Sequence, residues 1–347
     1  MAQERKRLRD LGIRIGVLQP GSWNAITDVP GVRVGHVTLG SGSAPEDGIC
    51  TGVTAIVPHD DAMPDRKLRA ASHVINGFGK TAGLVQLAEL GEMETPILLT
   101  NTFSVGAALE GGIRYLIEHG SGVGDGRPTP NVVVGECNDG YLNDLRAFAV
   151  RPEHAVQAIE LAAAGPVAEG AVGGGRGMVC CGWKGGIGTA SRKVPESDFS
   201  VGVLVQANFG AAADLTILGV PVGRHLRPAD FRPPDGSIIM VVATDLPWEA
   251  RALERLARRT TFGLARLGSV ASHGSGDIAI AFSTSADVTG AHQDGGHLAT
   301  AAFHAVAEAT EEAILNALAM AETTRGRLGR IVPALPLAKT LALLPRE

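Results

Sequence analysis

The residues best placed to do chemistry stand at one junction, where Ser237 follows Asp235-Gly236 and opens an apolar run at 238–244. Such a run predicts a buried strand with the serine at its beginning. If the Gly236–Ser237 peptide bond were cut, Ser237 would carry a hydroxyl and a free α-amine. An α-amine titrates near pH ~8, so its neutral form could accept the hydroxyl proton, which makes one residue both nucleophile and base. The same residues also fit an ordinary turn that leads into a core strand.

Two other segments carry side chains that could assist this serine. Asn208 ends the apolar run 201–207, and an amide at a strand end can donate to a developing oxyanion, a contribution of roughly 3–4 kcal/mol. Ser275 and Asp277 precede the run 278–283. Because they are two residues apart, they share one face of an extended backbone and could hold a nucleophile's hydroxyl or amine. Strand-capping or turn-forming roles would explain the same three residues without catalysis.

A further loop follows a predicted strand at 131–136 and contains Glu136 and Tyr141. A carboxylate could pair with a substrate ammonium, and a phenol could donate to an oxyanion. A polar surface turn would contain the same residues. The chain has no G-x-S-x-G, H-E-x-x-H or P-loop motif, and His292 and His297 lack the spacing of a helical ligand pair. We therefore predict neither a metal nor a cofactor.

The elements that must position these residues alternate between short strands and helices. Several strands are continuous apolar runs, which indicates sheets covered on both faces. The predicted strands are 32–38, 53–57, 97–101, 131–136, 178–182, 200–207, 238–245 and 278–283. The predicted helices are 81–90, 105–119, 153–164, 248–267 and 302–323. No low-complexity linker divides the chain, so we expect one layered α/β domain over residues 1–347.

Three details of this pattern are open to direct comparison with the structure. In the last helix, Glu308, Glu311 and Glu312 are expected to face water. Cys180 and Cys181 would point to opposite faces of a strand. The glycine-rich stretch 173–177 misses the dinucleotide fingerprint, because Cys180 stands where a glycine or alanine is needed. It therefore indicates turns or close strand crossings rather than a nucleotide site.

Composition excludes several classes of protein. A net charge of −5 with scattered basic residues and only 4% aromatic residues argues against nucleic-acid binding. Four cysteines without paired spacing argue against a disulfide framework and favour a reducing compartment. The N-terminal segment lacks the apolar stretch of a signal peptide, and no apolar run approaches the roughly 18 residues that span a bilayer. We expect a soluble, cytoplasmic protein with no membrane partner.

Taken together, these segments resemble the P1 (DmpA-type) peptidase family, which includes the L-aminopeptidase/D-amidase-esterase and the β-peptidyl aminopeptidases. The resemblance runs from about Arg9 to the last helix and spreads over many ordered blocks. The matching blocks are 24–36, Thr100-Asn101-Thr102, 136–144, 177–192, Asn208-Phe209-Gly210, 235–245 and 274–277.

The resemblance implies a precursor that cuts itself between Gly236 and Ser237 into an α segment 1–236 and a β segment 237–347. It implies Ser237 as nucleophile, Asn208 and Tyr141 at the oxyanion, and Ser275 with Asp277 as the pair that orients the nucleophile. Glu136 would anchor the substrate amine. Family members carry Glu or Asp at the last position of that pair, so Asp277 would lie about one methylene farther back. The segment 286–300 departs from the family pattern.

The resemblance also implies a four-layer αββα sandwich like that of N-terminal-nucleophile hydrolases, and a homotetramer of α/β heterodimers. The expected function is an aminopeptidase or amidase that releases N-terminal residues from small peptides, amides or esters through an acyl-enzyme on Ser237. Two alternatives stay open. One is an amide hydrolase of the nylon-oligomer type, although such proteins typically present threonine after the cut. The other is an inactive relative that binds amino-acid derivatives.

Overall fold

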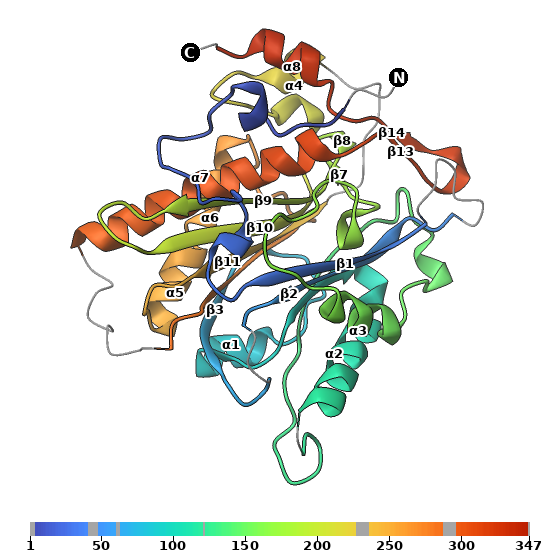
Figure 1. Ribbon diagram of the computed structural model, residues 1–347. Coiled ribbons are helices and arrows are strands. Elements are labelled where there is room, and N and C mark those ends of the chain that lie inside the picture. The colour runs from blue at the N-terminus through green and yellow to red at the C-terminus, as the bar shows by residue number, and fades with distance from the viewer. Residues whose placement is uncertain are drawn as a thin grey trace.

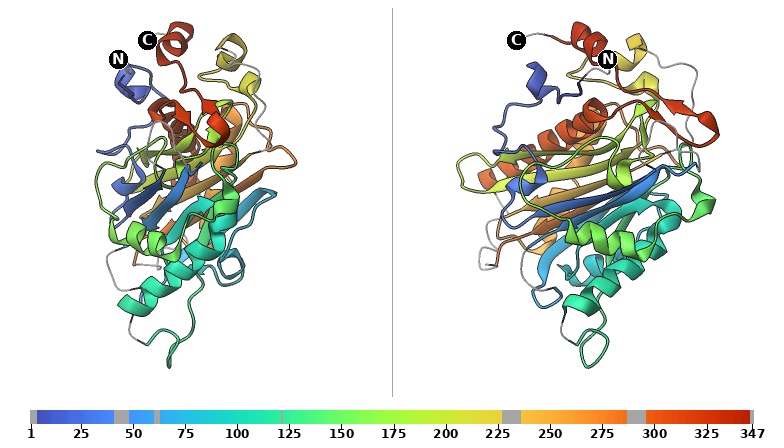
Figure 2. Two further views of the ribbon diagram at one scale, coloured as in Figure 1. Left: turned by 90° about the vertical axis from the view of Figure 1, so that its right-hand side faces the viewer. Right: turned by 45° about the vertical axis from the view of Figure 1, so that its right-hand side comes forward.

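Two β-sheets pack face to face and helices cover the outer side of each in the computed structural model, which describes residues 4–40, 48–59, 63–120, 122–226, 236–286 and 296–345 (Figure 1). Figure 2 shows this arrangement from two further sides, with the red α7 over one sheet and the teal α2 below the other. The expected four-layer αββα sandwich is confirmed.

The larger sheet has six strands in the order β4-β3-β12-β11-β10-β9. Neighbouring strands in this sheet pair antiparallel, except for β11 and β12. These two are parallel and are joined through α5 and α6. The strands are β3 (Leu68–Gly77), β4 (Glu92–Met93), β9 (Gly186–Lys193), β10 (Ser200–Asn208), β11 (Ser237–Thr244) and β12 (Gly276–Ser283). The covering helices are α5 (Ala250–Ala257), α6 (Thr260–Arg266) and α7 (Gly296–Met320).

The smaller sheet has the order β1-β2-β5-β6, with β5 and β6 parallel across the helix α2. Its elements are β1 (Arg33–Leu39), β2 (Thr51–Val57), β5 (Ile97–Asn101), β6 (Val133–Cys137), α2 (Val105–His119) and α3 (Pro152–Glu160). The remaining elements are α1 (Leu84–Leu90), β7 (Val179–Cys180), β8 (Trp183–Lys184), α4 (Val222–Leu226), β13 (Thr324–Arg325), β14 (Ile331–Val332) and α8 (Leu337–Leu343).

Alternation along the central strands sorts their side chains between two cores. On β11, Ile239 and Val241 join Leu99 and Val133 of the other sheet, whereas Met240 belongs to the core beneath the helices. Because both faces are buried, the strand reads as one unbroken apolar run. This explains why the central strands could be predicted to within one or two residues.

Two long strands, β3 and β9, were missed, as were the short elements β4, β8, β13, β14, α4 and α8, and one predicted helix is in fact two. β9 lacks an apolar run because α7 lies very close to it: a Cβ on Gly188 would stand 2.0 Å from the carbonyl oxygen of Ala313. β3 mixes polar and apolar residues. The predicted helix 248–267 is two helices, since α5 packs on β3 and β12 whereas α6 packs on α7.

The expectation that the glutamates of the last helix face water was wrong. Glu308, Glu311 and Glu312 are all buried. Glu312 accepts from Arg9 at 2.7 Å and from Arg192 at 2.5 Å, and Arg192 also donates to Glu308 at 3.0 Å. The basic partners come from distant parts of the chain, so the helix sequence alone gave no sign of them.

This buried network predicts a large stability effect. Glu312→Ala should lower the free energy of unfolding by about 3–5 kcal/mol, because it removes one partner of a buried ion pair. Glu254→Ala, which breaks an exposed pair with Arg258 on α5, should change it by only about 0.5 kcal/mol. Urea unfolding of both variants, made in a Ser237→Ala chain, measures the difference. Equal effects would contradict this role for the network.

In the part of the chain that the structure describes, no helix combines the length and apolar character needed to cross a membrane.

Candidate active site

The sequence-distant candidates meet at one edge of the six-stranded sheet. Ser237 is the first residue of β11, and Gly276 is the first residue of β12. Because β11 and β12 are parallel, both begin at the same edge, and the antiparallel β10 ends there with Asn208. Asn208 and Ser237 are direct partners in the strand register. The topology therefore brings three separate segments together.

Ser237 is held from one side by a backbone amide. The residue is 5% exposed, and its Oγ accepts a hydrogen bond from the backbone N–H of Gly276 at 3.1 Å. The residue before it must be small, since a Cβ on Gly236 would stand 1.8 Å from the carbonyl oxygen of Asn208. The need for glycine at this junction is thus steric.

Ser275 and Asp277 form the pair that their spacing predicted. Ser275 Oγ donates to Asp277 Oδ1 at 2.6 Å. The other carboxylate oxygen, Oδ2, is buried without a hydrogen-bond partner. Burial raises the pKa of Asp277 to about 6, so the carboxylate is mostly ionised at neutral pH beside the serine's strand.

The Asn208 side chain has a fixed orientation. Its Oδ1 accepts from the backbone N–H of Val179 at 2.8 Å, and its Nδ2 donates to the carbonyl of Asn138 at 3.0 Å. Because one neighbour can only donate and the other can only accept, the amide cannot be flipped. An amide nitrogen carries two hydrogens, so the second is available to another acceptor at this edge.

Glu136 belongs to the smaller sheet and faces the same edge. It is 2% exposed, Oε1 accepts from the backbone N–H of Lys80 at 2.9 Å, and Oε2 accepts from the Thr102 hydroxyl. A Cβ on Gly79 would lie 3.8 Å from both Glu136 Oε1 and the Cα of Gly276. Gly79 therefore lies between the Glu136 carboxylate and Gly276, whose backbone N–H donates to Ser237.

Tyr141 lies in the loop that also supplies the Asn138 carbonyl. Its ring packs against the cluster of Cys50, Leu142, Val179 and Val332. The Arg330 guanidinium lies 4.7 Å from the ring centroid. The structure thus places Tyr141 on the same loop–strand unit that orients Asn208.

The Cys180–Cys181 pair does not point to opposite faces. The strand ends at Cys180, Cys181 takes a left-handed backbone (φ +48°), and the two Sγ atoms are 4.0 Å apart. The glycine stretch just before it is a close crossing, as predicted: a Cβ on Gly175 would stand 2.7 Å from the Cα of Gly186.

Sequence reasoning missed the groups that hold the site together. Backbone donors such as the amides of Gly276, Val179 and Lys80 carry no sequence signature. Asn76 was also missed, although its Nδ2 donates to the carbonyls of Ser272 and His273, both at 3.0 Å, and to that of Ser275. An asparagine near the end of a strand was the available signal. His292 lies outside the described residues, and His297 is exposed in the first turn of α7.

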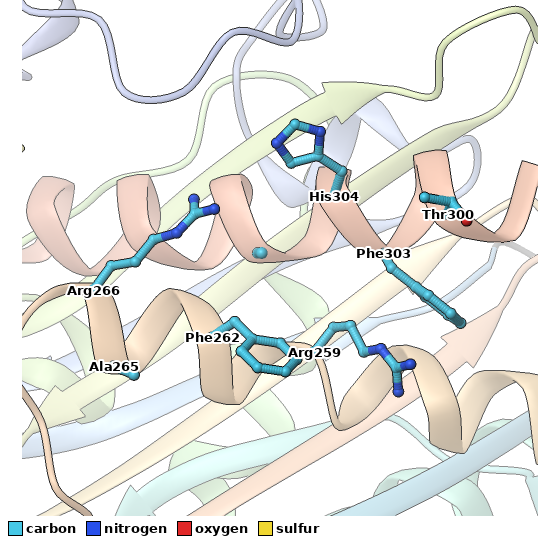
Figure 3. Close-up of a pocket in the computed structure, with 8 residues that line it drawn as sticks. Arg259, Phe262, Ala265, Arg266, Thr300, Phe303 and His304 are labelled. Atoms are coloured by element: carbon cyan, nitrogen blue, oxygen red, sulfur yellow. The ribbon is translucent and has the colours of Figure 1, made fainter. Parts of the chain in front are cut away.

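An open groove lies elsewhere, between α6 and α7 in the outer helical layer (Figure 3). Arg259 lies over the Phe303 ring at 4.0 Å from its centroid. The groove is lined by Arg259, Phe262, Ala265, Arg266, Thr300, Phe303, His304 and Ala307. None of these is a candidate site residue, so the groove is not where the chemistry of Ser237 would occur.

Comparisons with known proteins identify the family. The model of peptidase family S58 matches residues 24–332. The chain belongs to peptidase family S58. A β-peptidyl aminopeptidase of Sphingosinicella microcystinivorans is 42% identical, over 99% of this chain and 93% of that protein. The expected family is thereby confirmed.

Solved structures extend the agreement to the fold. A β-aminopeptidase from a Burkholderia species has a TM-score of 0.88 at 42% identity, covering 98% of each chain. The L-aminopeptidase D-Ala-esterase/amidase of Ochrobactrum anthropi, described as a serine aminopeptidase with a variant of the Ntn-hydrolase fold, has a TM-score of 0.88 at 37% identity, covering 97% of this chain and 98% of that one. The family S58 chain is thus a hydrolase with an aminopeptidase or amidase function.

Proposed function

We propose that this chain cuts itself between Gly236 and Ser237, and that the freed Ser237 is the nucleophile of the mature aminopeptidase. The proposal depends on the meeting of three segments at one edge of the sheet. Ser237 is the strand-register partner of Asn208 and accepts a hydrogen bond from the backbone N–H of Gly276. Gly276 lies between Ser275 and Asp277, whose side chains are hydrogen-bonded to each other. That arrangement supplies a nucleophile, an amide donor and an ionised carboxylate.

The self-cutting step begins with attack of Ser237 Oγ on the Gly236 carbonyl carbon. The bond between that carbon and the Ser237 nitrogen breaks, an ester forms, and the nitrogen takes the hydroxyl proton. Water then hydrolyses the ester, which gives a carboxylate on Gly236 and restores the Ser237 hydroxyl beside its free amine. Segments 1–236 and 237–347 remain together in one αββα domain, because β11 lies between β10 and β12.

The mature cycle uses the same atoms. The neutral Ser237 amine takes the hydroxyl proton as Oγ attacks the substrate carbonyl, and an amide hydrogen of Asn208 binds the oxyanion. The leaving amine takes that proton, and water releases the acyl group. The unpartnered Oδ2 of Asp277 is available to the protonated amine of Ser237. The Tyr141 phenol is a further oxyanion donor in this proposal.

Glu136 anchors the substrate's own ammonium in this proposal, so a free N-terminus is required. The names of the β-peptidyl relatives favour β-aminoacyl groups as substrates. The test compares β-alanyl p-nitroanilide, L-alanyl p-nitroanilide and N-acetyl-β-alanyl p-nitroanilide on protein whose cut is verified by mass. We expect turnover of the first two and none of the third. Equal turnover of the acetylated compound would overturn the aminopeptidase assignment.

Glu136→Gln tests the anchor directly. It removes the charge but keeps the shape, so kcat/KM for β-alanyl p-nitroanilide should fall about 30-fold or more, mainly through KM, as for loss of one member of a buried charge pair. Glu110→Gln, an exposed glutamate of α2, should leave both constants unchanged. An unaltered KM in Glu136→Gln would remove this residue from the substrate site.

The two alternatives make different predictions with the same protein. Preferential hydrolysis of 6-aminohexanoate oligomers over aminoacyl anilides would favour the nylon-oligomer type. Binding of aminoacyl amides without turnover would favour the inactive relative. The homotetramer of α/β heterodimers and the cytoplasmic location also belong to this proposal. Sedimentation of the cut protein and fractionation of the source cells test them.

A further inference from the structure

Lys184 has a place in the fold that the proposed chemistry does not use. It is a lysine of β8 with no exposed surface. Its ammonium donates to the carbonyls of Gly175 at 3.0 Å, Met178 at 2.8 Å and Gly185 at 2.8 Å. Among the described residues no carboxylate forms an ion pair with it. Three backbone carbonyls therefore take its three hydrogens.

Burial makes this charge unfavourable and lowers the pKa of Lys184 to about 7. The titratable groups around it are Cys50, Asp139, Cys180 and Arg176. A buried methionine could fill such a space without desolvating a charge. Methionine would, however, leave three buried carbonyls without this donor, and one of them belongs to the peptide that holds Asn208.

One of its three acceptors connects it to the oxyanion amide. The Met178 carbonyl and the Val179 N–H are the two ends of a single peptide unit. Lys184 donates to the first, and the second donates to Asn208 Oδ1 at 2.8 Å. Hydrogen bonds in a row polarise one another, most strongly where water is excluded. Val179 and Asn208 are 4% and 6% exposed.

We propose that Lys184 is a positioning residue for the oxyanion amide: through the Met178–Val179 peptide its ammonium holds Asn208 in place and strengthens Nδ2 as a donor. This inference rests on the proposed function, because it acts only through Asn208. On the other side of Asn208, the Asn138 carbonyl takes one Nδ2 hydrogen, which leaves the second to meet the oxyanion. The charge thus acts on the transition state and not on substrate binding.

The test is a double-mutant cycle on purified, mass-verified enzyme, made of the wild type, Lys184→Met, Asn208→Ala and the double variant. Lys184→Met should lower kcat per cut chain by about 10- to 100-fold, the range found for residues that orient metal ligands, with KM nearly unchanged. In the Asn208→Ala chain the same change should lower kcat no further, because coupled residues are not additive. Lys193→Met, which replaces an exposed lysine of β9, is the matched control and should keep the wild-type kcat.

Each outcome decides between the two proposals. If both substitutions lower kcat and their effects multiply, Lys184 does not act through Asn208 and the inference is wrong. If Asn208→Ala leaves kcat unchanged, the oxyanion assignment in the proposed function fails instead. Lys184→Gln, which can still donate but carries no charge, repeats the cycle if Lys184→Met does not fold. If neither variant folds, Lys184 serves the fold and the positioning role is rejected.

Discussion

Replacing Ser237 with alanine should leave the protein as one uncut chain of 347 residues without aminopeptidase activity. Alanine removes Oγ, which is the attacking atom both in the cut and in turnover. No other nucleophile is assigned to this edge, so the rate should drop to the assay background, a loss of about 10⁶-fold where a serine nucleophile has been removed. Intact-mass measurement checks that the chain is uncut, and an aminoacyl anilide assay on the same sample checks that activity is lost.

The matched control is Ser283→Ala. Ser283 is a buried serine that ends β12, and its hydroxyl donates to the Leu246 carbonyl. That variant should be cut normally and keep its activity. A Ser237→Ala protein that still divides at residue 236, or a wild-type protein that stays whole yet hydrolyses aminoacyl amides at full rate, would contradict the proposed mechanism.

The polar residues of the site could be found from the sequence because they lie at the ends of apolar strands. Ser237, Asn208 and Asp277 each border a run that a two-sided sheet makes continuous. The apolar runs do not reveal the order in which the strands lie in the sheet. Only the parallel pairing of β11 with β12, and the antiparallel pairing of β10, puts the three at one edge.

The charged residues were harder to place, because burial of a charge depends on its partner. Glu312 has the sequence context of an exposed helix face, yet it is buried and forms ion pairs with Arg9 and Arg192. Lys184 stands among glycines, and only the folded loop shows that three carbonyls surround it. Hydrogen bonds to backbone groups do not depend on the side chain of the accepting residue, so the sequence cannot reveal them.

Asn208→Ala should lower kcat by about 10²- to 10³-fold, as removal of one oxyanion donor does in other hydrolases. The same donor serves the cut at Gly236, so this variant should also mature slowly and leave uncut chain in fresh preparations. Rates are therefore expressed per cut chain, with the cut fraction measured by intact mass. The matched control is Asn316→Ala, since Asn316 is a fully buried asparagine that donates to the Thr189 carbonyl, outside the candidate site.

A purely structural role for Asn208 would also slow the enzyme, because the side chain ties Val179 to the Asn138 loop. Asn208→Asp keeps only the Val179 half of this tie. Its carboxylate still accepts from the Val179 amide, but it has neither the hydrogen that Nδ2 gives to the Asn138 carbonyl nor the one proposed for the oxyanion. If donation matters, kcat should fall at least as far as in Asn208→Ala while KM changes little. Near-wild-type turnover in Asn208→Asp would show that the reaction needs the Val179 contact and no Nδ2 donor.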